Sequence, residues 1–191
     1  MIVVSRKLIA GLIRGEDDAY LAVIKTLKQP VYRFALRLCR DSTMAEDVTQ
    51  QTFLAIWQSI GSFRWKSKFS TWVFGIAYRQ YLLLRRKNRF ETLQLVESDQ
   101  SDRSDLSDLL AESQQKALVR RAVYDLPSTY REVVSLIYLE GFTCSEAAEV
   151  LGIPIGTVKS RINSALRILR KTLGESEEHD EQQESPDAIH T

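Results

Sequence analysis

The sequence predicts an all-α protein with two small helical domains joined by a flexible acidic linker. Apolar residues recur at spacings of three and four along most of the 191 residues, alternating β-branched segments are scarce, and only 4 prolines interrupt the chain. Ser and Asp dominate residues 91–111, where the helical periodicity is lost. We therefore expect domains at 1–90 and 112–173, with the linker between them and an acidic disordered tail at 174–191.

Each helix is expected where the apolar period and a start signal coincide. The first domain should hold helices at 5–14, 17–28, 30–40, 43–60 and 70–89, and the second at 112–125, 128–140, 144–151 and 156–172. Three pairs fit a capping box, in which a hydroxyl and a carboxylate each accept a bond from a free N–H of the first turn. They are Thr43 with Glu46, Thr129 with Glu132, and Thr143 with Glu146.

The net charge of +1 conceals a strong segregation of charge along the chain. Residues 1–90 hold 16 basic and 6 acidic residues, and residues 113–173 hold 9 and 5. Residues 91–112 hold 1 basic and 7 acidic residues, and residues 174–191 hold 7 acidic residues and no basic one. Basic blocks of this kind are typical of surfaces that bind polyanions, which favours nucleic acid as a partner.

Residues 143–172 have the pattern of a helix-turn-helix. A short capped helix ends at Gly152, which suits a left-handed C-terminal position, and a longer helix follows Pro154. On the longer helix Val158, Ile162, Ala165 and Leu169 form an apolar stripe. The opposite face is polar, basic and free of acids, as a helix in the DNA major groove requires. The alternative is a basic helix face that is merely solvated.

Aromatic and basic residues alternate in the segment "SFRWKSKFSTWVFGIAYRQYLLLRRKNRF", residues 62–90. Rings beside a positive groove are a common means of holding unpaired bases, and each stacked base contributes about 1–3 kcal/mol. The alternative is that the rings fill the core of a bundle. We favour the core for Trp72 and Phe74, and nucleic-acid binding for Trp65 and the lysines that follow it.

The helix expected at 43–60 has a polar stripe that includes Glu46, Asp47, Gln50, Gln51 and Gln58. Phe53, Ile56 and Trp57 flank this stripe. Such a face can dock on the helices of another protein, and a plain solvated face has the same pattern. Spacing alone leaves both possibilities open.

Several functional classes lack their signatures. The sequence has no metalloprotease or phosphate-loop motif, and His179 and His190 both lie in the acidic tail. Cys39 and Cys144 are far apart and have no metal-binding spacing, so we expect no metal site, no cofactor and no catalytic residue. With no membrane-spanning run and no secretory pattern, we expect a cytoplasmic protein. A self-sufficient helix-turn-helix regulator stays open as an alternative function.

These segments together resemble the bacterial extracytoplasmic-function (ECF) sigma factors, the small promoter-specificity subunits of RNA polymerase. The resemblance covers about residues 8–90 and 112–172. It rests on "AEDVTQQTFLAIW", "FSTWVFGIA" and "LPSTYREVVSLIYLEGFTCSEAAEVLGIPIGTVKSRI", which stand in the family's order and at its separations.

The resemblance implies that the protein directs core RNA polymerase to promoters by binding the −35 element and by recognising and melting the −10 element. The implied core polymerase contacts, on the β′ clamp helices, are Asp47, Gln50, Gln51, Phe53 and Trp57. The implied −10 contacts are Phe63, Trp65, Lys66, Lys68, Phe69, Trp72, Tyr78, Arg79, Arg85 and Arg86. The implied −35 contacts are Thr157, Lys159, Ser160, Arg161, Asn163, Ser164, Arg167 and Lys171.

The resemblance also implies partners and control. Besides promoter DNA, the expected partners are the β′ and β subunits of the polymerase and an anti-sigma factor, which in this family is often membrane-anchored. No small-molecule substrate is expected. The linker is expected to pass near the RNA exit path, and the tail either to shield the basic recognition helix or only to add solubility.

Overall fold

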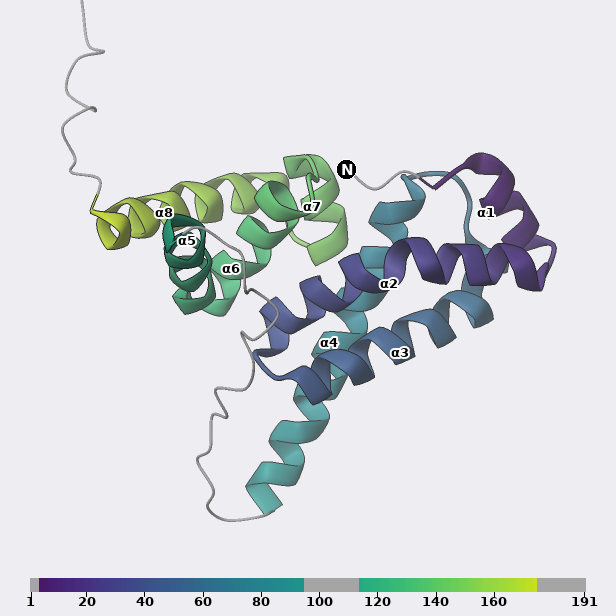
Figure 1. Ribbon diagram of the computed structural model, residues 1–191, viewed down its shortest axis with the longest axis horizontal. Helices are drawn as coiled ribbons and strands as arrows, with labels where there is room; N and C mark the ends of the chain where they lie inside the picture. Colours follow the sequence, from purple (N-terminus) through teal and green to yellow (C-terminus); the bar gives the residue numbers. More distant parts are fainter. Residues whose placement is uncertain (1–3, 95–113, 175–191) are drawn as a thin grey trace, which may run out of the picture.

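The computed structural model describes residues 4–94 and 114–174, and every regular element within these ranges is helical (Figure 1). The elements are α1 (Arg6–Ile13), α2 (Asp17–Cys39), α3 (Ser42–Ser59), the 3-10 turn η1 (Ile60–Ser62), α4 (Phe69–Gln94), α5 (Gln114–Asp125), α6 (Ser128–Val134), the π-helical turn η2 (Ser135–Leu139), α7 (Cys144–Leu151) and α8 (Ile155–Leu173). The predicted all-α class is confirmed. No helix among the described residues is long and apolar enough to span a membrane.

The N-terminal half is a bundle built on α2, α3 and α4. In Figure 1, α2 and α3 run side by side and α4 crosses both of them. The core side chains are fully buried because each helix turns one apolar stripe inward, and each buried side chain contributes about 1.5–3 kcal/mol. Core residues from the three helices are Val23, Leu27, Val31, Phe34, Val48, Ile56, Val73 and Phe74.

The two helices expected at 17–28 and 30–40 form one continuous helix, so the predicted break between them is wrong. Pro30 lies inside α2, where it removes one backbone donor at a cost of about 3 kcal/mol. Val23, Leu27 and Val31 are all completely buried on one side of this helix. Their burial offsets the cost of the proline, which is why tertiary packing prevails over the local preference.

Only one of the three expected capping boxes is confirmed. Thr143 Oγ1 accepts from the Glu146 N–H at 3.2 Å, and the Glu146 carboxylate accepts from the Thr143 N–H at 2.8 Å. The box expected at Thr43 is wrong, because α3 begins one residue earlier and Asp41 accepts from the Met44 N–H at 2.5 Å. The box expected at Thr129 is also wrong, because its carboxylate partner, Glu132, turns to another helix.

The C-terminal half packs α6, α7 and α8 around a small core. Its buried residues include Leu126, Val133, Leu136, Val150, Leu151, Val158, Ile162 and Ala165. The helix expected at 128–140 is regular only as far as Val134, and it continues as the π-helical turn through Leu139. The final helix ends at Gly174, whose φ of 78° places it in the left-handed region that glycine adopts without strain.

α4 continues beyond the expected end at residue 89 and includes Gln94. The first residues of the expected linker are therefore helical. The rest of the linker, and the acidic tail after Gly174, lie outside the described residues.

The two halves are in direct contact. α7 packs against α4, and α6 packs against α2. The Phe142 ring lies 5.0 Å from the Phe74 ring, between ring centroids, and Phe74 in turn lies 5.2 Å from Phe34. One continuous hydrophobic core therefore runs from the N-terminal bundle into the C-terminal half.

Candidate nucleic-acid interface

The short helix α7 and the longer helix α8 form the expected helix-turn-helix. Gly152 has a φ of 65°, and its N–H donates to the carbonyl of Ala148, which ends α7. The Ile153 N–H donates to the same carbonyl at 3.2 Å, which closes the turn. Val158, Ile162 and Ala165 of α8 are buried, as the stripe predicted, and they determine which side of the helix faces solvent.

The outer face of α8 presents cations and polar groups to solvent. Exposed residues on this face are Lys159, Ser160, Asn163, Arg167 and Lys171, and partly buried ones are Thr157, Arg161 and Ser164. The helix contains no Asp or Glu between Ile155 and Leu173. The Ser160 hydroxyl donates to the Thr157 carbonyl of its own helix at 3.0 Å. This face can therefore meet phosphates with cations and base edges with donors.

The loop between η1 and α4 exposes one aromatic ring above a layer of buried ones. Trp65 is 47% exposed and has a φ of 58°, which is unusual for a residue with a side chain. Its ring lies 5.2 Å from that of Phe63, and Phe63 in turn contacts Phe69 at 5.5 Å and Trp72 at 5.4 Å. Phe63 and Phe69 are buried, so Trp65 is the ring of this set that faces solvent.

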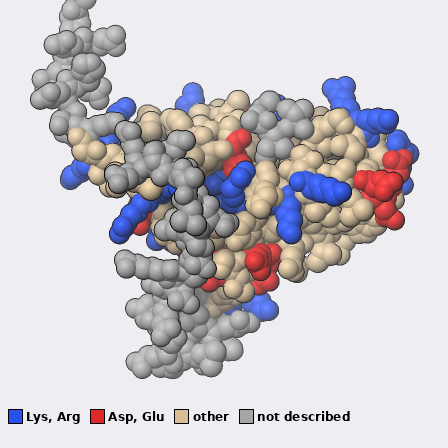
Figure 2. All heavy atoms as spheres, in the orientation of Figure 1, with Lys and Arg blue, Asp and Glu red and all other residues tan. Residues whose placement is uncertain are grey.

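The cations of the N-terminal half are placed beside this loop and along α4. Lys66, Lys68, Arg79, Arg85 and Arg86 are all exposed. Arg85 Nη1 donates to the Tyr81 hydroxyl at 3.2 Å, and this bond directs its guanidinium toward the C-terminal half. The face of the molecule in Figure 2 shows Lys and Arg side chains dispersed over several elements, while acidic side chains gather where α1 joins α2.

Part of the expected −10 surface touches the C-terminal half. Lys68 Nζ lies 2.7 Å from a Glu146 carboxylate oxygen, and the Tyr78 hydroxyl donates to the Glu132 carboxylate at 3.1 Å. A third contact joins Arg37 and Glu140, whose side chain is only 5% exposed. In this arrangement the C-terminal half covers one side of α4, so a partner could reach that side only after the halves separate.

Burial and hydrogen bonding shift the pKa values of these interface groups in different directions. Burial raises the pKa of Tyr78, and the neighbouring Glu132 carboxylate raises it further. Burial also raises the pKa of Glu132, although the Tyr78 hydrogen bond and nearby arginines oppose the shift. Burial raises the pKa of Glu146 as well, but the bonds from Lys68 and Thr143 outweigh it and the pKa is lowered. Burial therefore disfavours the charged form of the Glu132 carboxyl group in the folded protein.

The helix expected to dock on the polymerase presents a polar face with one large ring. Asp47, Gln50 and Gln51 are exposed on α3, and Trp57 is 43% exposed. The Trp57 ring meets the Tyr20 ring edge-on at 4.8 Å, and the Tyr20 hydroxyl donates to the Phe53 carbonyl at 2.9 Å. The Phe53 side chain itself is buried and belongs to the core.

Sequence reasoning did not anticipate the contacts between the halves. Three acids of the C-terminal half, Glu132, Glu140 and Glu146, each bind a residue of the N-terminal half. A signal was present, because these are three of only 5 acids in residues 113–173, and the partner domain is strongly basic. Arg6 was also missed; its guanidinium carbon lies 5.9 Å from the centre of the Trp65 ring.

Comparison with known proteins identifies both halves. A family model described as Sigma-70 region 2 matches residues 23–91, and one described as Sigma-70, region 4 matches residues 116–169. The ECF RNA polymerase sigma factor SigL of Mycobacterium tuberculosis is 34% identical over 171 residues, which covers 87% of this chain and 91% of SigL. SigW of Bacillus subtilis is 28% identical over 179 residues, with 88% and 96% covered.

Solved structures agree with these relatives. The sigma factor RpoE from Bartonella quintana, solved in complex with the anti-sigma factor NepR, has a TM-score of 0.70 and 25% identity, with 82% of this chain and 98% of that chain covered. CnrH, solved in complex with the cytosolic domain of CnrY, shares the fold with a TM-score of 0.64 and 24% identity, with 90% and 98% covered. The chain belongs to the ECF sigma factors of RNA polymerase.

Proposed function

We propose that this sigma factor divides its work between two regions of the chain. Residues 1–90 dock on core polymerase and open the −10 element, and residues 112–173 bind the −35 element. The matches to region 2 and region 4 models support this division. Residues 91–111 connect the two regions, and residues 174–191 are an acidic tail that either shields the recognition helix or only adds solubility. Bond formation belongs to the polymerase, and the sigma factor works beside it in the cytoplasm.

The polymerase docks on the exposed side of α3. Asp47, Gln50 and Gln51 offer hydrogen bonds there, and Trp57 offers a large ring that is already held by Tyr20. A ring that is half exposed and rigid is typical of residues that dominate binding energy, since it loses little side-chain entropy on binding. The buried Phe53 side chain does not contact the polymerase directly; it packs in the core beneath this face of α3 and keeps the helix in position.

A base extruded from the −10 element stacks on Trp65. The ring is exposed, supported by Phe63, and flanked by Lys66 and Lys68, which can hold the adjacent phosphates. Extruding a base costs a few kcal/mol, so the site must supply both stacking and charge. Arg79, Arg85 and Arg86 continue the positive surface along α4 toward the duplex.

The observation that best supports promoter recognition is the outer face of α8. It is exposed, rich in cations and free of acids, and its orientation is set by a buried stripe on the opposite side. Asn163 and Arg167 lie where a helix in the major groove contacts base edges, and Lys159 and Lys171 lie where it meets phosphates.

An anti-sigma factor controls the protein. The solved structures of RpoE with NepR and of CnrH with the cytosolic domain of CnrY support this proposal, since both proteins share the fold of this chain. The anti-sigma factor that we expect binds both regions of this chain. It covers the face of α3 that would otherwise dock on the polymerase.

Run-off transcription tests the proposed function. First, the complex of core polymerase with this protein is used to select promoter fragments from a genomic library. These fragments are then transcribed by purified core polymerase with and without the protein. We expect transcripts of defined length only when the protein is added. Tight sequence-specific binding of duplex DNA by the protein alone, with no transcript in any reaction, would instead establish a self-sufficient regulator.

The docking proposal predicts that Trp57→Ala weakens association with core polymerase by about 30-fold, because an exposed anchoring ring is lost. The matched control is Tyr138→Ala, which removes an aromatic ring that is 56% exposed on the C-terminal half, away from α3. Binding is measured by biolayer interferometry with immobilised core polymerase. Equal losses in the two variants would place the docking surface elsewhere.

A further inference from the structure

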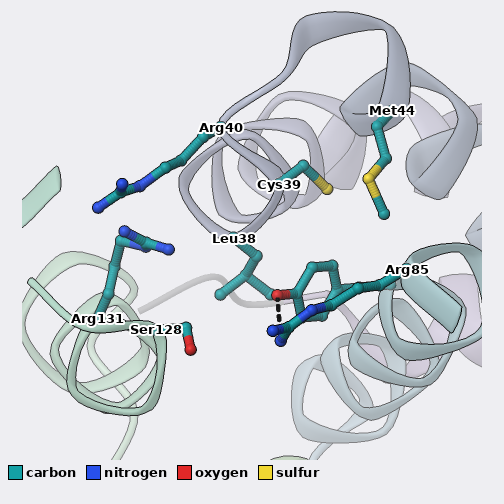
Figure 3. A pocket seen from close by; sticks show the side chains of 8 residues that line it. Leu38, Cys39, Arg40, Met44, Arg85, Ser128 and Arg131 are labelled. Carbon is teal, nitrogen blue, oxygen red and sulfur yellow. Dashed lines mark hydrogen bonds between the residues drawn. The ribbon is translucent and has the colours of Figure 1, made fainter. Parts of the chain in front are cut away.

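A pocket of about 220 Å³ opens between the two halves of the molecule (Figure 3). The end of α2 contributes Cys39 and Arg40, α4 contributes Tyr81 and Arg85, and α6 contributes Ser128 and Arg131. The lining therefore comes from both regions of the sigma factor, and the pocket exists in this form only while the two regions are in contact.

The described residues that line this pocket are positively charged and include no Asp or Glu. Arg40, Arg85 and Arg131 supply the charge. Two carboxylates belong to neighbouring positions, but each already binds another group: Asp41 accepts from the Met44 N–H, and Glu132 accepts from the Tyr78 hydroxyl. Neither is among the residues that line the pocket.

Backbone carbonyls of the α5–α6 turn hold two of these guanidinium groups together. Arg131 Nη1 donates to the carbonyls of Tyr124 at 2.7 Å and Leu126 at 3.0 Å. Arg40 Nη2 donates to the same two carbonyls, and its guanidinium carbon lies 4.6 Å from the centre of the Tyr124 ring. Figure 3 shows Arg40 and Arg131 on one side of the pocket and Arg85 on the other.

Glu132 offsets part of this charge, because it acts on Arg85 and Arg131, but no carboxylate of the described residues lines the pocket itself. Arg131 is only 4% exposed, and its Nε has no hydrogen-bond partner among the residues that the structure describes. Burial lowers the pKa of Arg131, and the nearby charge of Arg40 lowers it further. Like charges in a partly desolvated site repel one another strongly, and guanidinium groups are the side chains best suited to bind phosphate oxygens. A small multivalent anion would relieve the repulsion and bind all three groups.

We propose that this pocket binds a small phosphate-type anion, either an inorganic phosphate or the phosphate end of a nucleotide, and that the bound anion holds the two regions together. Because the anion binds the contacting arrangement and not the separated one, binding stabilises the contact by mass action. Binding also lowers the availability of the −10 surface, since Arg85 then contacts the anion and Lys68 stays with Glu146. This last consequence rests on the proposed function.

Isothermal titration calorimetry with the full chain tests the site, and inorganic pyrophosphate is the probe. Ionic strength is held constant with sodium chloride, so that general screening does not change along the titration. We expect one pyrophosphate per chain and a loss of at least about tenfold in affinity for Arg40→Gln, because a charge-assisted contact is removed. Arg33→Gln is the matched control, since Arg33 is an exposed arginine of the same helix outside the pocket.

A second variant distinguishes an anion site from a merely structural cluster. Ser128→Asp places a carboxylate at the pocket, where it should abolish pyrophosphate binding and at the same time raise the Tm of the free protein. Thr129→Asp adds the same charge at the next, exposed residue of α6 without filling the pocket. It should leave pyrophosphate binding within about twofold of wild type, because it removes no contact of the anion.

The outcomes separate cleanly. A second titration uses ATP in place of pyrophosphate. Binding of pyrophosphate alone, or of both compounds, supports the site, and tighter binding of ATP than of pyrophosphate assigns the natural ligand to nucleotides. Equal losses for Arg40→Gln and Arg33→Gln, or no binding up to about 1 mM, would overturn the proposal. Neither polymerase nor promoter DNA is present, so failure here is distinct from failure of the proposed function.

Discussion

The two surfaces proposed to bind promoter DNA are presented in opposite ways. The outer face of α8 is open to solvent along its length, whereas one side of α4 and its preceding loop is held by two carboxylates and a ring of the C-terminal half. The −10 and −35 elements lie about 25 base pairs apart, which is about 85 Å at about 3.4 Å per base pair. Under the proposed division of work, regions in direct contact cannot reach both elements, so we expect the molecule to open on a promoter.

We therefore expect the α8 surface to be available to DNA in the closed molecule, and the α4 surface to become available only when the contacts between the halves break. The contacts between the halves use interactions that DNA would also make. The Glu146 carboxylate pairs with Lys68 as a phosphate would, and the Phe142 ring packs against the Phe74 ring of α4 as a base could pack on an aromatic ring.

Replacing Phe142 by Ala should open the molecule. Phe142 is buried against Phe74, and removing a buried ring of this kind costs about 3–5 kcal/mol. We expect a larger radius of gyration by small-angle X-ray scattering and stronger binding of single-stranded −10 DNA. Leu139→Ala is the control, since Leu139 is a neighbouring apolar residue that is 47% exposed. An unchanged radius in Phe142→Ala would mean that other contacts hold the regions together.

Replacing Arg167 by Ala tests the open surface. Arg167 is exposed on α8, so we expect affinity for −35 duplex DNA to fall by about tenfold and its salt dependence to decrease by about one ion. The measurement is fluorescence anisotropy at several salt concentrations. Arg33→Ala, which removes an exposed arginine from α2, should change neither value. A similar loss in both variants would indicate attraction to the net charge alone.

Replacing Glu146 by Gln should release Lys68 while keeping the α7 cap, because Gln can also complete a capping box. Lys68 is half exposed, so we expect only about a fivefold gain or less in binding of single-stranded −10 DNA, and no gain at high salt.

The same ion pair has a defined pH dependence. Because the pKa of Glu146 is lowered in the folded protein, its stabilising contribution is present above the pKa of the unfolded chain and is lost as the pH falls through the folded pKa. Thermal unfolding between about pH 3 and about pH 6 should show this loss in the wild type and not in Glu146→Gln. Parallel curves would contradict the ion pair.

Replacing Glu132 by Gln should have the smallest effect and the opposite sign. Burial raises the pKa of Glu132, so the folded protein binds this proton more tightly than the unfolded chain does. The stability that this provides is present below the unfolded pKa and is lost as the pH rises through the folded pKa. Gln can still accept from Tyr78, so Glu132→Gln should raise the Tm near pH 7 and match the wild type near pH 4. A lower Tm near pH 7 would show that the surrounding arginines outweigh burial.

Most of the fold was predictable because it depends on local period and turn chemistry. The apolar stripe of Val158, Ile162 and Ala165 predicts both α8 and its outer face, and Gly152 predicts the end of α7. Pro30 misled the prediction, since a proline interrupts a helix locally but α2 buries enough apolar surface on both sides of it to remain continuous. The two missed caps have different origins: Asp41 caps α3 in place of Thr43, and Glu132 binds Tyr78 of another helix and does not return to Thr129.

The helices, the helix-turn-helix and the basic character of the two halves were all predictable from the amino-acid sequence, because they follow from residues close together in the chain. Three further features depend on the tertiary structure: which side of α4 is covered, which ring of the loop is exposed, and that Arg40, Arg85 and Arg131 line one pocket. Each of these depends on contacts between residues tens of positions apart. Such contacts arise from the packing of one half on the other, and the local spacing of apolar residues in the sequence does not predict them.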